Sequence, residues 1–192
     1  MASAVSDPAL LEAAARAFER HGFAGATLER IAEEAGLSRV TLHRRGVKKE
    51  ALLAELASRA TEDYRRMMWP ALTAEGSAAE RLEIALHALC EAAEAHLALL
   101  VALRAQSDAV FHGDDAEEAM TRSVFTEPLE RLLRDGAAEG SIDVEDPVES
   151  ATVLFNMVAL TYIHLRTGHG WRPERARKAS VEPVLDGLRA RA

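Results

Sequence analysis

The sequence predicts an all-α protein with a three-helix N-terminal part and a longer helical part. Apolar residues recur at helical spacing along most of the 192 residues, and no strand-like alternation or tandem repeat is evident. A glycine-containing turn separates two short helices near the N-terminus, and longer helical patterns follow. Because 48% of the residues are hydrophobic, the chain is expected to be globular rather than disordered.

The first two helices carry recognisable start and stop signals. Asp7 can cap the first helix, and Pro8 suits the first helical position. Thr27 can cap the second helix, although Arg30 stands where a full capping box would have glutamate or glutamine. Gly36 is expected to end the second helix, because glycine accepts a left-handed backbone without steric penalty.

A short third helix, from Ser38 to Arg45, is expected after this turn. Between Ser38 and Lys49 the chain has five basic side chains and no acidic one. A helix, a glycine-containing turn and a second helix rich in cations is the pattern with which a helix-turn-helix reads a major groove.

The net charge of −8 would by itself argue against a nucleic-acid partner. The distribution of charge changes this conclusion, because residues 1–52 have eight basic and seven acidic side chains, and residues 53–192 have 15 and 24. Screening confines charge effects to about 10 Å, so a focused basic patch can bind phosphates on an acidic protein.

The N-terminal quarter of the chain resembles the TetR family of bacterial transcription regulators. The family's motifs are matched in order by Ala13, Ala14, Phe18, Gly22, Phe23, Thr27, Ile31, Ala32, Ala35, Gly36, Leu37, Ser38, Thr41, Leu42, Lys49, Glu50 and Leu52. The resemblance implies a helix-turn-helix DNA-binding domain over residues 1–52. It also implies a helical effector-binding and dimerisation domain over residues 53–192.

The basic patch and the resemblance together indicate the DNA-binding residues. They are Thr27, Ser38, Arg39, Val40, Thr41, His43, Arg44, Arg45 and Lys49. Arg39 and either Arg44 or Arg45 are the candidates for guanine edges, because the planar fork of arginine matches O6 and N7. Lys49, at the start of the following helix, suits a phosphate contact.

The chain departs from the family pattern at four places. His43 replaces a tyrosine, Arg45 replaces an aromatic residue or histidine, and Gly46 replaces a phenylalanine that fixes the recognition helix to the core. Losing such a buried aromatic residue costs about 3 kcal/mol or more, and Val47 is expected to fill part of the gap. Asp7 stands where a basic residue is common, which removes one phosphate contact.

Further helices are expected after residue 52. An apolar stripe runs to Trp69 and Pro70, where proline is expected to end the helix. Residues 78–107 predict two helices or one bent helix, and residues 111–115 predict a loop. Residues 115–139 predict a helix with a kink or break at Pro128.

The segment 148–165 is apolar nearly all round, so it must be covered on several sides. It is shorter than the roughly 20 apolar residues of a membrane span and contains polar side chains, so no membrane partner is expected. With the last helix it predicts a four-helix homodimer interface, as the resemblance also implies; burial within one chain is the alternative. The interface candidates are Phe155, Val158, Tyr162, Val184, Leu185 and Leu188.

The resemblance also implies an effector cavity among the middle helices. Its candidate residues are Trp69, His87, Leu100, Arg104, Phe125, Phe155 and Asn156. His87, Cys90, Glu94 and His96 could approach a metal, but the paired Cys or His motifs of structural zinc sites are missing. With no G-x-S-x-G turn and no glycine-rich phosphate loop, neither an enzyme nor a cofactor is expected.

The predicted function is a sequence-specific DNA-binding transcriptional regulator. The resemblance favours a repressor that binds double-stranded operator DNA as a homodimer and is released by a small-molecule effector. The single cysteine and the absence of a secretion leader predict a cytoplasmic protein. The alternative is a sensor or interaction protein on a TetR scaffold with a degenerate DNA-binding head, which His43 and Gly46 keep open.

Overall fold

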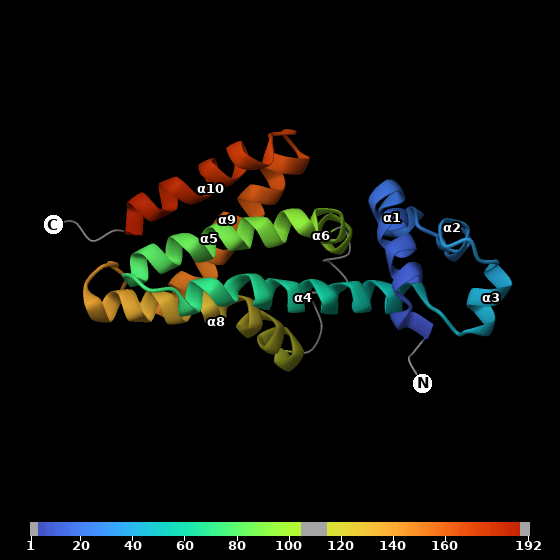
Figure 1. The fold of residues 1–192 in the computed structure, drawn as a ribbon, viewed down its shortest axis with the longest axis horizontal. Coiled ribbons are helices and arrows are strands. Elements are labelled where there is room, and N and C mark those ends of the chain that lie inside the picture. The colour runs from blue at the N-terminus through green and yellow to red at the C-terminus, as the bar shows by residue number, and fades with distance from the viewer. Residues whose placement is uncertain (1–3, 105–114, 189–192) are drawn as a thin grey trace. The chain divides into compact units, whose positions relative to one another are not determined.

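The computed structural model describes residues 4–104 and 115–188, and its regular elements are helices (Figure 1). This arrangement confirms the predicted all-α fold class. The described residues fall into two compact units. The first unit holds residues 4–62 and 96–104, and the second holds residues 63–95 and 115–188. The predicted 111–115 loop lies partly outside the described residues.

The first unit contains the helices of the predicted DNA-binding domain (residues 1–52), here called the head, and one helix from further along the chain. They are the 3-10 helix η1 (Ala4–Ser6), α1 (Pro8–Gly25), α2 (Leu28–Glu34), α3 (Arg39–Arg44), the first part of α4 (Lys49–Thr73), and α6 (Leu97–Arg104). The predicted cap of α1 is confirmed, because the Asp7 side chain accepts a hydrogen bond from the Ala9 N–H at 3.1 Å. The helical path of α1 is interrupted at Gly22, whose φ is 63°.

Apolar side chains from all these α-helices form the core of the first unit. The largest contributors are Leu10, Leu11, Phe18, Ile31, Leu42, Val47, Leu52 and Leu99. Each fully buried Leu or Phe stabilises the unit by about 1.5–3 kcal/mol. Because α6 packs along α1, residues far along the chain help to complete this core. The domain division at residue 52 stays a prediction.

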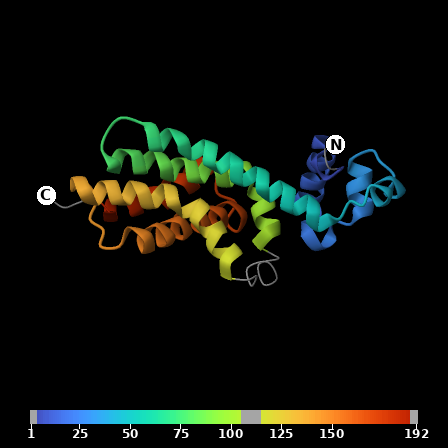
Figure 2. The same ribbon diagram turned by 90° about the horizontal axis from the view of Figure 1, so that it is seen from below.

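The second unit is a bundle of the last part of α4 with α5 (Ala78–Ala95), α8 (Asp115–Glu139), α9 (Pro147–Thr167) and α10 (Pro173–Leu188). α9 packs against α5, α8 and α10, and Figure 2 shows α8 and α9 side by side. Asp146 caps α9, since its side chain accepts hydrogen bonds from the N–H groups of Val148 and Glu149. Residues 78–104 form two helices, α5 and α6, which are separated at His96.

Three prolines lie inside helices instead of ending them. α4 continues through Pro70 to Thr73, so the expectation that this helix ends at Pro70 is wrong. α8 runs through Pro128, and α10 runs through Pro183. A proline removes one backbone hydrogen bond and strains the preceding turn. Tertiary packing outweighs this local cost here, because buried side chains lie within two residues of each proline, such as Ala71, Leu129 and Val181.

One face of α9 is buried and the other is exposed. Val158 and Tyr162 are buried at 0% and 2% exposure, and Leu185 of α10 is buried at 6%. Neighbouring helices of the same unit cover these three interface candidates, which agrees with the alternative of burial within one chain. Phe155, Val184 and Leu188 are partly buried. The opposite face of α9 exposes Val153, Met157 and Leu160 at 49%, 52% and 44%.

By length and composition, α9 could cross a bilayer. Its contacts with α5, α8 and α10 instead make it the central helix of the second unit. A core helix of this kind passes the same test of length and hydropathy.

A charged cluster, formed by Glu94, Tyr162 and Arg166, connects α5 to α9. Arg166 donates to Glu94 from Nε at 2.8 Å and from Nη2 at 2.7 Å, and the Tyr162 hydroxyl donates to Glu94 at 2.9 Å. Arg166 also donates to the carbonyl of Trp171. The Arg166 guanidinium holds the pKa of Glu94 below its ordinary value, so the carboxylate stays charged. The cluster therefore fixes α9 and the following turn against α5.

Candidate DNA-binding interface

The turn between α2 and α3 is formed by local hydrogen bonds. The Thr27 hydroxyl accepts a hydrogen bond from the Arg30 N–H, so Thr27 caps α2 as predicted. Gly36, with φ of 64°, ends α2, and the Leu37 N–H donates to the Ala32 carbonyl at 2.8 Å. This is the hydrogen bond of a Schellman motif, which needs a residue in the left-handed conformation. It reverses the chain directly before α3.

α3 is capped at its start and anchored at its end. The Ser38 hydroxyl accepts a hydrogen bond from the Thr41 N–H at 3.1 Å and contacts the Thr41 hydroxyl at 2.8 Å. Gly46, with φ of 65°, ends the helix, and the Val47 N–H donates to the Leu42 carbonyl. Val47 is 3% exposed and belongs to the head core, so it takes the anchoring place expected for it.

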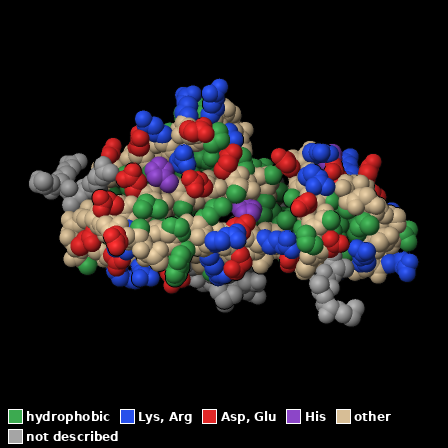
Figure 3. Space-filling view, in the orientation of Figure 1, with side chains coloured by type: hydrophobic (Ala, Val, Ile, Leu, Met, Phe, Trp, Pro, Cys, Tyr) green, Lys and Arg blue, Asp and Glu red, His purple; other side chains and the backbone are tan. Residues whose placement is uncertain are grey.

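α3 presents its polar face to solvent because Leu42 fixes the opposite face. Leu42 is fully buried, whereas Arg39, His43, Arg44 and Arg45 are exposed. Val40 is 66% exposed, which is unusual for a branched apolar side chain without a partner. In Figure 3, Lys and Arg side chains lie beside apolar ones at the α3 end of the head. The helix therefore offers both hydrogen-bond donors and an apolar contact on one surface.

Two of the cations predicted to contact DNA are paired with acids of the head. Arg39 Nε lies 2.8 Å from Glu29 Oε1, and Arg45 Nη1 lies 3.7 Å from Asp7 Oδ2. The sequence interpretation did not foresee either pair, because both acids lie outside the segment that contains the cations. Their positions before α1 and in the first turn of α2 become informative only when the helices are packed.

Lys49 is used inside the head. Its Nζ donates to the Phe23 carbonyl at 2.8 Å and lies 4.2 Å from the centre of the Phe23 ring. The amine thus satisfies a carbonyl near the end of α1 and holds the start of α4 against it. The predicted phosphate contact of Lys49 stays a prediction, and it would compete with these two interactions.

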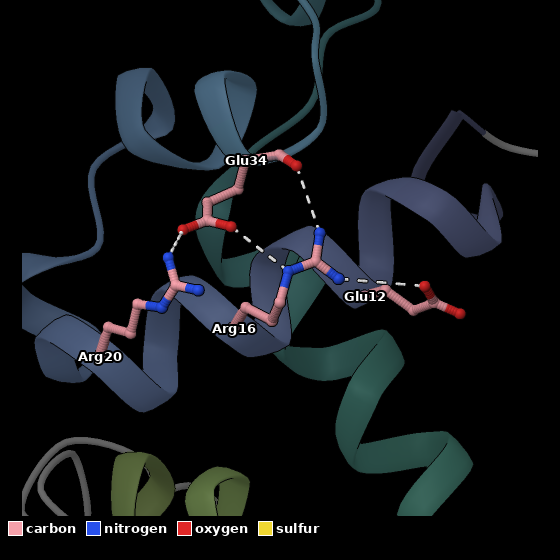
Figure 4. Close-up of polar contacts among 4 residues, drawn as sticks. All are labelled: Glu12, Arg16, Arg20 and Glu34. Atoms are coloured by element: carbon pink, nitrogen blue, oxygen red, sulfur yellow. Dashed lines mark hydrogen bonds and ion pairs between the residues drawn. The ribbon is translucent and has the colours of Figure 1, made fainter.

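Glu34, the last residue of α2, connects this helix to α1 (Figure 4). Its carboxylate pairs with Arg20 and with Arg16 Nε at 3.3 Å, and Arg16 also donates to the Glu34 carbonyl at 3.2 Å. Glu12 lies 4.0 Å from the other side of Arg16. Because Glu34 is partly buried, this cluster helps to set the angle at which α2 leaves α1, and with it the position of α3.

The comparisons with known proteins identify this head. Residues 10–56 match the family model described as bacterial regulatory proteins, tetR family. These residues therefore form a TetR-family DNA-binding head. No curated protein sequence matches the chain.

Solved structures extend the likeness to the whole TetR-family fold. A member of the TetR family from Streptomyces coelicolor is 25% identical, with a TM-score of 0.63, over 94% of this chain and 90% of that one. A TetR-family transcriptional regulator from Thermus thermophilus is 21% identical, with a TM-score of 0.73, over 92% and 94%. A third structure, which concerns control of antibiotic production by bacterial hormones, is 22% identical, with a TM-score of 0.72, over 95% and 96%.

The predicted effector residues are only partly brought together. Phe125 and Phe155 are in ring contact at 5.8 Å, and each also contacts Tyr64, which the sequence interpretation did not include among the effector residues. The Tyr64 hydroxyl donates to the Phe125 carbonyl at 2.6 Å. We call Tyr64, Phe125 and Phe155 the aromatic cluster.

The other predicted effector residues have no ring contact with the aromatic cluster among the described residues. Trp69 is 65% exposed, and the exposed Asn156 donates to its own helix at Thr152. Leu100 belongs to the first unit, and the side chain of Arg104 lies outside the described residues. His87 is half-exposed, and its Nδ1 is buried without a hydrogen-bond partner among the described residues.

Three of the residues considered for a metal, His87, Cys90 and Glu94, lie on α5. Within the described ranges, no three His, Cys, Asp or Glu side chains are grouped so as to hold a metal ion. Burial raises the pKa of the Cys90 thiol to about 12, so this thiol stays protonated at neutral pH. Glu94 is engaged by Arg166 and Tyr162.

Proposed function

We propose that this protein recognises a specific operator in double-stranded DNA through α3 and represses transcription until a small molecule releases it. The observation that carries the proposal is the orientation of α3. Its buried Leu42 turns Arg39, Val40, His43 and Arg44 outward from the head. A short exposed helix held by a rigid turn is what enters a major groove in helix-turn-helix proteins.

Each exposed side chain of α3 has chemistry that suits a groove. Arg39 and Arg44 can each offer two parallel donors to guanine O6 and N7. Val40 can contact the methyl group of thymine, which is the apolar feature of the major groove. His43 and Arg45 can donate to phosphates, which position the helix without reading sequence. The expected operator therefore contains guanine and thymine within each half-site.

The partner of the chain is a second copy of itself. One helix of six residues supplies few base contacts, and helix-turn-helix proteins gain affinity by placing two heads about 34–36 Å apart on one face of DNA. The exposed apolar face of α9, with Val153, Met157 and Leu160, is the surface that a second copy would cover. An obligate interface buries about 2,000 Å² or more, so α10 would contribute as well.

The effector is expected to bind in the second unit near the aromatic cluster. Tyr64, Phe125 and Phe155 offer apolar and ring contacts, and the unpartnered Nδ1 of His87 on α5 is a polar group that a ligand could satisfy. One similar structure concerns control by bacterial hormones, which supports a small-molecule effector. Such a molecule lowers DNA affinity if it binds the DNA-competent arrangement of heads less well than another arrangement. A cytoplasmic location fits access to chromosomal DNA.

A selection experiment on random DNA duplexes tests the proposal. The purified full-length protein is expected to enrich a palindromic or near-palindromic sequence. Arg44→Ala should relax base preference within each half-site, because it removes a guanine fork. Arg134→Ala, which changes an exposed arginine of α8, is the matched control and should leave the selected sequence unchanged. Absence of enrichment by the native protein would instead support the alternative, a sensor with a degenerate head.

A further inference from the structure

Two acidic residues, Asp7 and Glu29, pair with the basic residues Arg45 and Arg39, and their structural roles differ. Asp7 caps α1, and this local role explains its position. Glu29 does not cap α2, because Thr27 does. It lies in the first turn of α2 and reaches across the turn to Arg39, the first residue of α3. The Glu29–Arg39 pair is therefore a direct connection between the two helices of the helix-turn-helix.

Glu29 carries a negative charge beside the start of α3. Hydrogen bonding to its own backbone and the charge of Arg39 lower the pKa of Glu29 below its ordinary value, so the carboxylate is ionised at neutral pH. Its Oε1 lies 2.8 Å from Nε of Arg39, the first residue of α3.

The contact between Glu29 and Arg39 is made through Nε and does not use the two Nη groups of the guanidinium. Glu29 Oε1 lies 2.8 Å from Nε, while the two Nη groups remain available to form two parallel hydrogen bonds. The Arg39 side chain is 71% exposed, so without Glu29 it would sample many rotamers. Binding DNA would then require the loss of that freedom, which weakens the contact.

The same carboxylate disfavours binding to DNA of the wrong sequence. Affinity for DNA without regard to sequence depends on cations that neutralise phosphates, and an acid beside the contact surface opposes it. Where a guanine is present, the Arg39 fork compensates for this repulsion. Where no guanine is present, the repulsion remains without compensation.

We propose that Glu29 is a specificity-determining positioning residue, which orients Arg39 toward a guanine and weakens binding to other sequences. This inference rests on the proposed DNA-binding function. A purely structural role of Glu29 would give a different result. An exposed ion pair contributes little to stability, and its loss would change the affinity for all DNA sequences equally.

The test compares Glu29→Gln with Glu33→Gln in the full-length protein. Glu33 is exposed on the same helix and forms no ion pair with the described residues of α3, so its substitution matches the change in charge. Dissociation constants are measured for the selected operator and for a scrambled duplex of equal length. Glu29→Gln is expected to reduce the ratio of the two affinities about tenfold, partly by tightening the scrambled complex, while Glu33→Gln preserves the ratio.

A double variant tests whether Glu29 acts through Arg39. Arg39→Ala should also reduce the ratio, and adding Glu29→Gln to Arg39→Ala should reduce it no further, because Glu29 acts through Arg39. An unchanged ratio in Glu29→Gln, or a fully additive double variant, would overturn the inference and leave the operator function intact. A native protein that binds operator and scrambled DNA equally would overturn the function and the inference together.

Discussion

The amine of Lys49 stabilises the head, because it bonds to the Phe23 carbonyl and lies over the Phe23 ring. We expect Lys49→Ala to lower the free energy of unfolding by about 1–2 kcal/mol, since a charged hydrogen bond and a cation–π contact are both lost. Urea unfolding followed by circular dichroism measures this change. The salt dependence of DNA binding should remain nearly unchanged, because the amine is already engaged.

Lys48 provides the control, since it is the neighbouring exposed lysine. Lys48→Ala should leave the unfolding free energy within about 0.5 kcal/mol of the native value. A Lys49→Ala variant of native stability whose salt slope is flatter by about one unit would show that Lys49 contacts a phosphate instead.

Single residues were predictable from sequence where their partners are close along the chain. The caps Asp7, Thr27 and Ser38 each bond to a backbone N–H two or three residues away, so residue type and spacing were sufficient. The pair of Glu29 and Arg39 depends on how α2 and α3 pack across the turn. That geometry is not encoded in a local pattern, so the sequence interpretation missed Glu29.

Between helices, the Glu94–Arg166 pair predicts a pH-dependent contribution to stability. The folded pKa of Glu94 is lowered from 4.5, so the contribution is fully present above about pH 4.5 and is lost as pH falls through the lower folded value. We expect Glu94→Gln to destabilise the native protein by about 1–2 kcal/mol at pH 7, discounted for partial exposure of the pair. The difference should shrink at pH 3, as unfolding by urea at both pH values will show.

Glu91→Gln is the matched control for this experiment. Glu91 lies on the same helix and pairs with Arg177 at 2.8 Å, but its side chain is 59% exposed. Its substitution should cost no more than about 1 kcal/mol at pH 7. Equal effects of the two substitutions would contradict the role assigned to the Glu94 cluster.

Replacing glycine with alanine is expected to change stability in opposite directions at two helical positions, Gly136 and Gly187. A Cβ at Gly136 in α8 would lie 2.6 Å from Ile142 Cγ1, and Ile142 is buried. Gly136→Ala should therefore destabilise the second unit by about 1–3 kcal/mol. A Cβ at Gly187 in α10 would meet nothing within 4 Å, so Gly187→Ala should stabilise by about 0.4–1 kcal/mol. Thermal unfolding of both variants measures the contrast, and destabilisation by both would contradict it.

Apolar periodicity in the sequence correctly predicted where helices lie. The position of proline was a poor guide to where α4 ends. The segment after Lys49 was recognised as a helix, but its end was placed at Pro70, and α4 continues to Thr73. The local cost of proline is visible in a sequence, whereas the compensating burial of Met68 and Ala71 is visible only in the packed unit. Pro128, by contrast, lies inside α8 as the sequence predicted.

At the scale of the whole molecule, the sequence was sufficient for the fold class and the DNA-binding head, whereas the composition of the effector region stays a prediction. Leu100 and Phe125 were both assigned to that region because the resemblance implies a cavity among the middle helices. The structure places Leu100 in the first compact unit and Phe125 in the second. Helical periodicity shows which face of a helix is apolar, and it does not show which other helix covers that face.

The dimer proposal gives the last prediction, which concerns the exposed face of α9. Met157 is 52% exposed among apolar neighbours, so a charge there is tolerated by the single chain but is costly in an interface that excludes water. We expect Met157→Glu to give folded monomers and to weaken operator binding at least tenfold, because two linked heads are then lost. Light scattering and circular dichroism measure the two properties.

Ile84 on α5 is also exposed, at 40%, and Ile84→Glu should leave the dimer intact. Leu185→Glu should behave differently from both, because Leu185 is 6% exposed and an unpaired charge there disrupts the core of the second unit. It is expected to unfold or aggregate rather than to give folded monomers. A folded, monomeric Leu185→Glu variant, together with a dimeric Met157→Glu variant, would place the interface on the opposite face and refute the assignment to Val153, Met157 and Leu160.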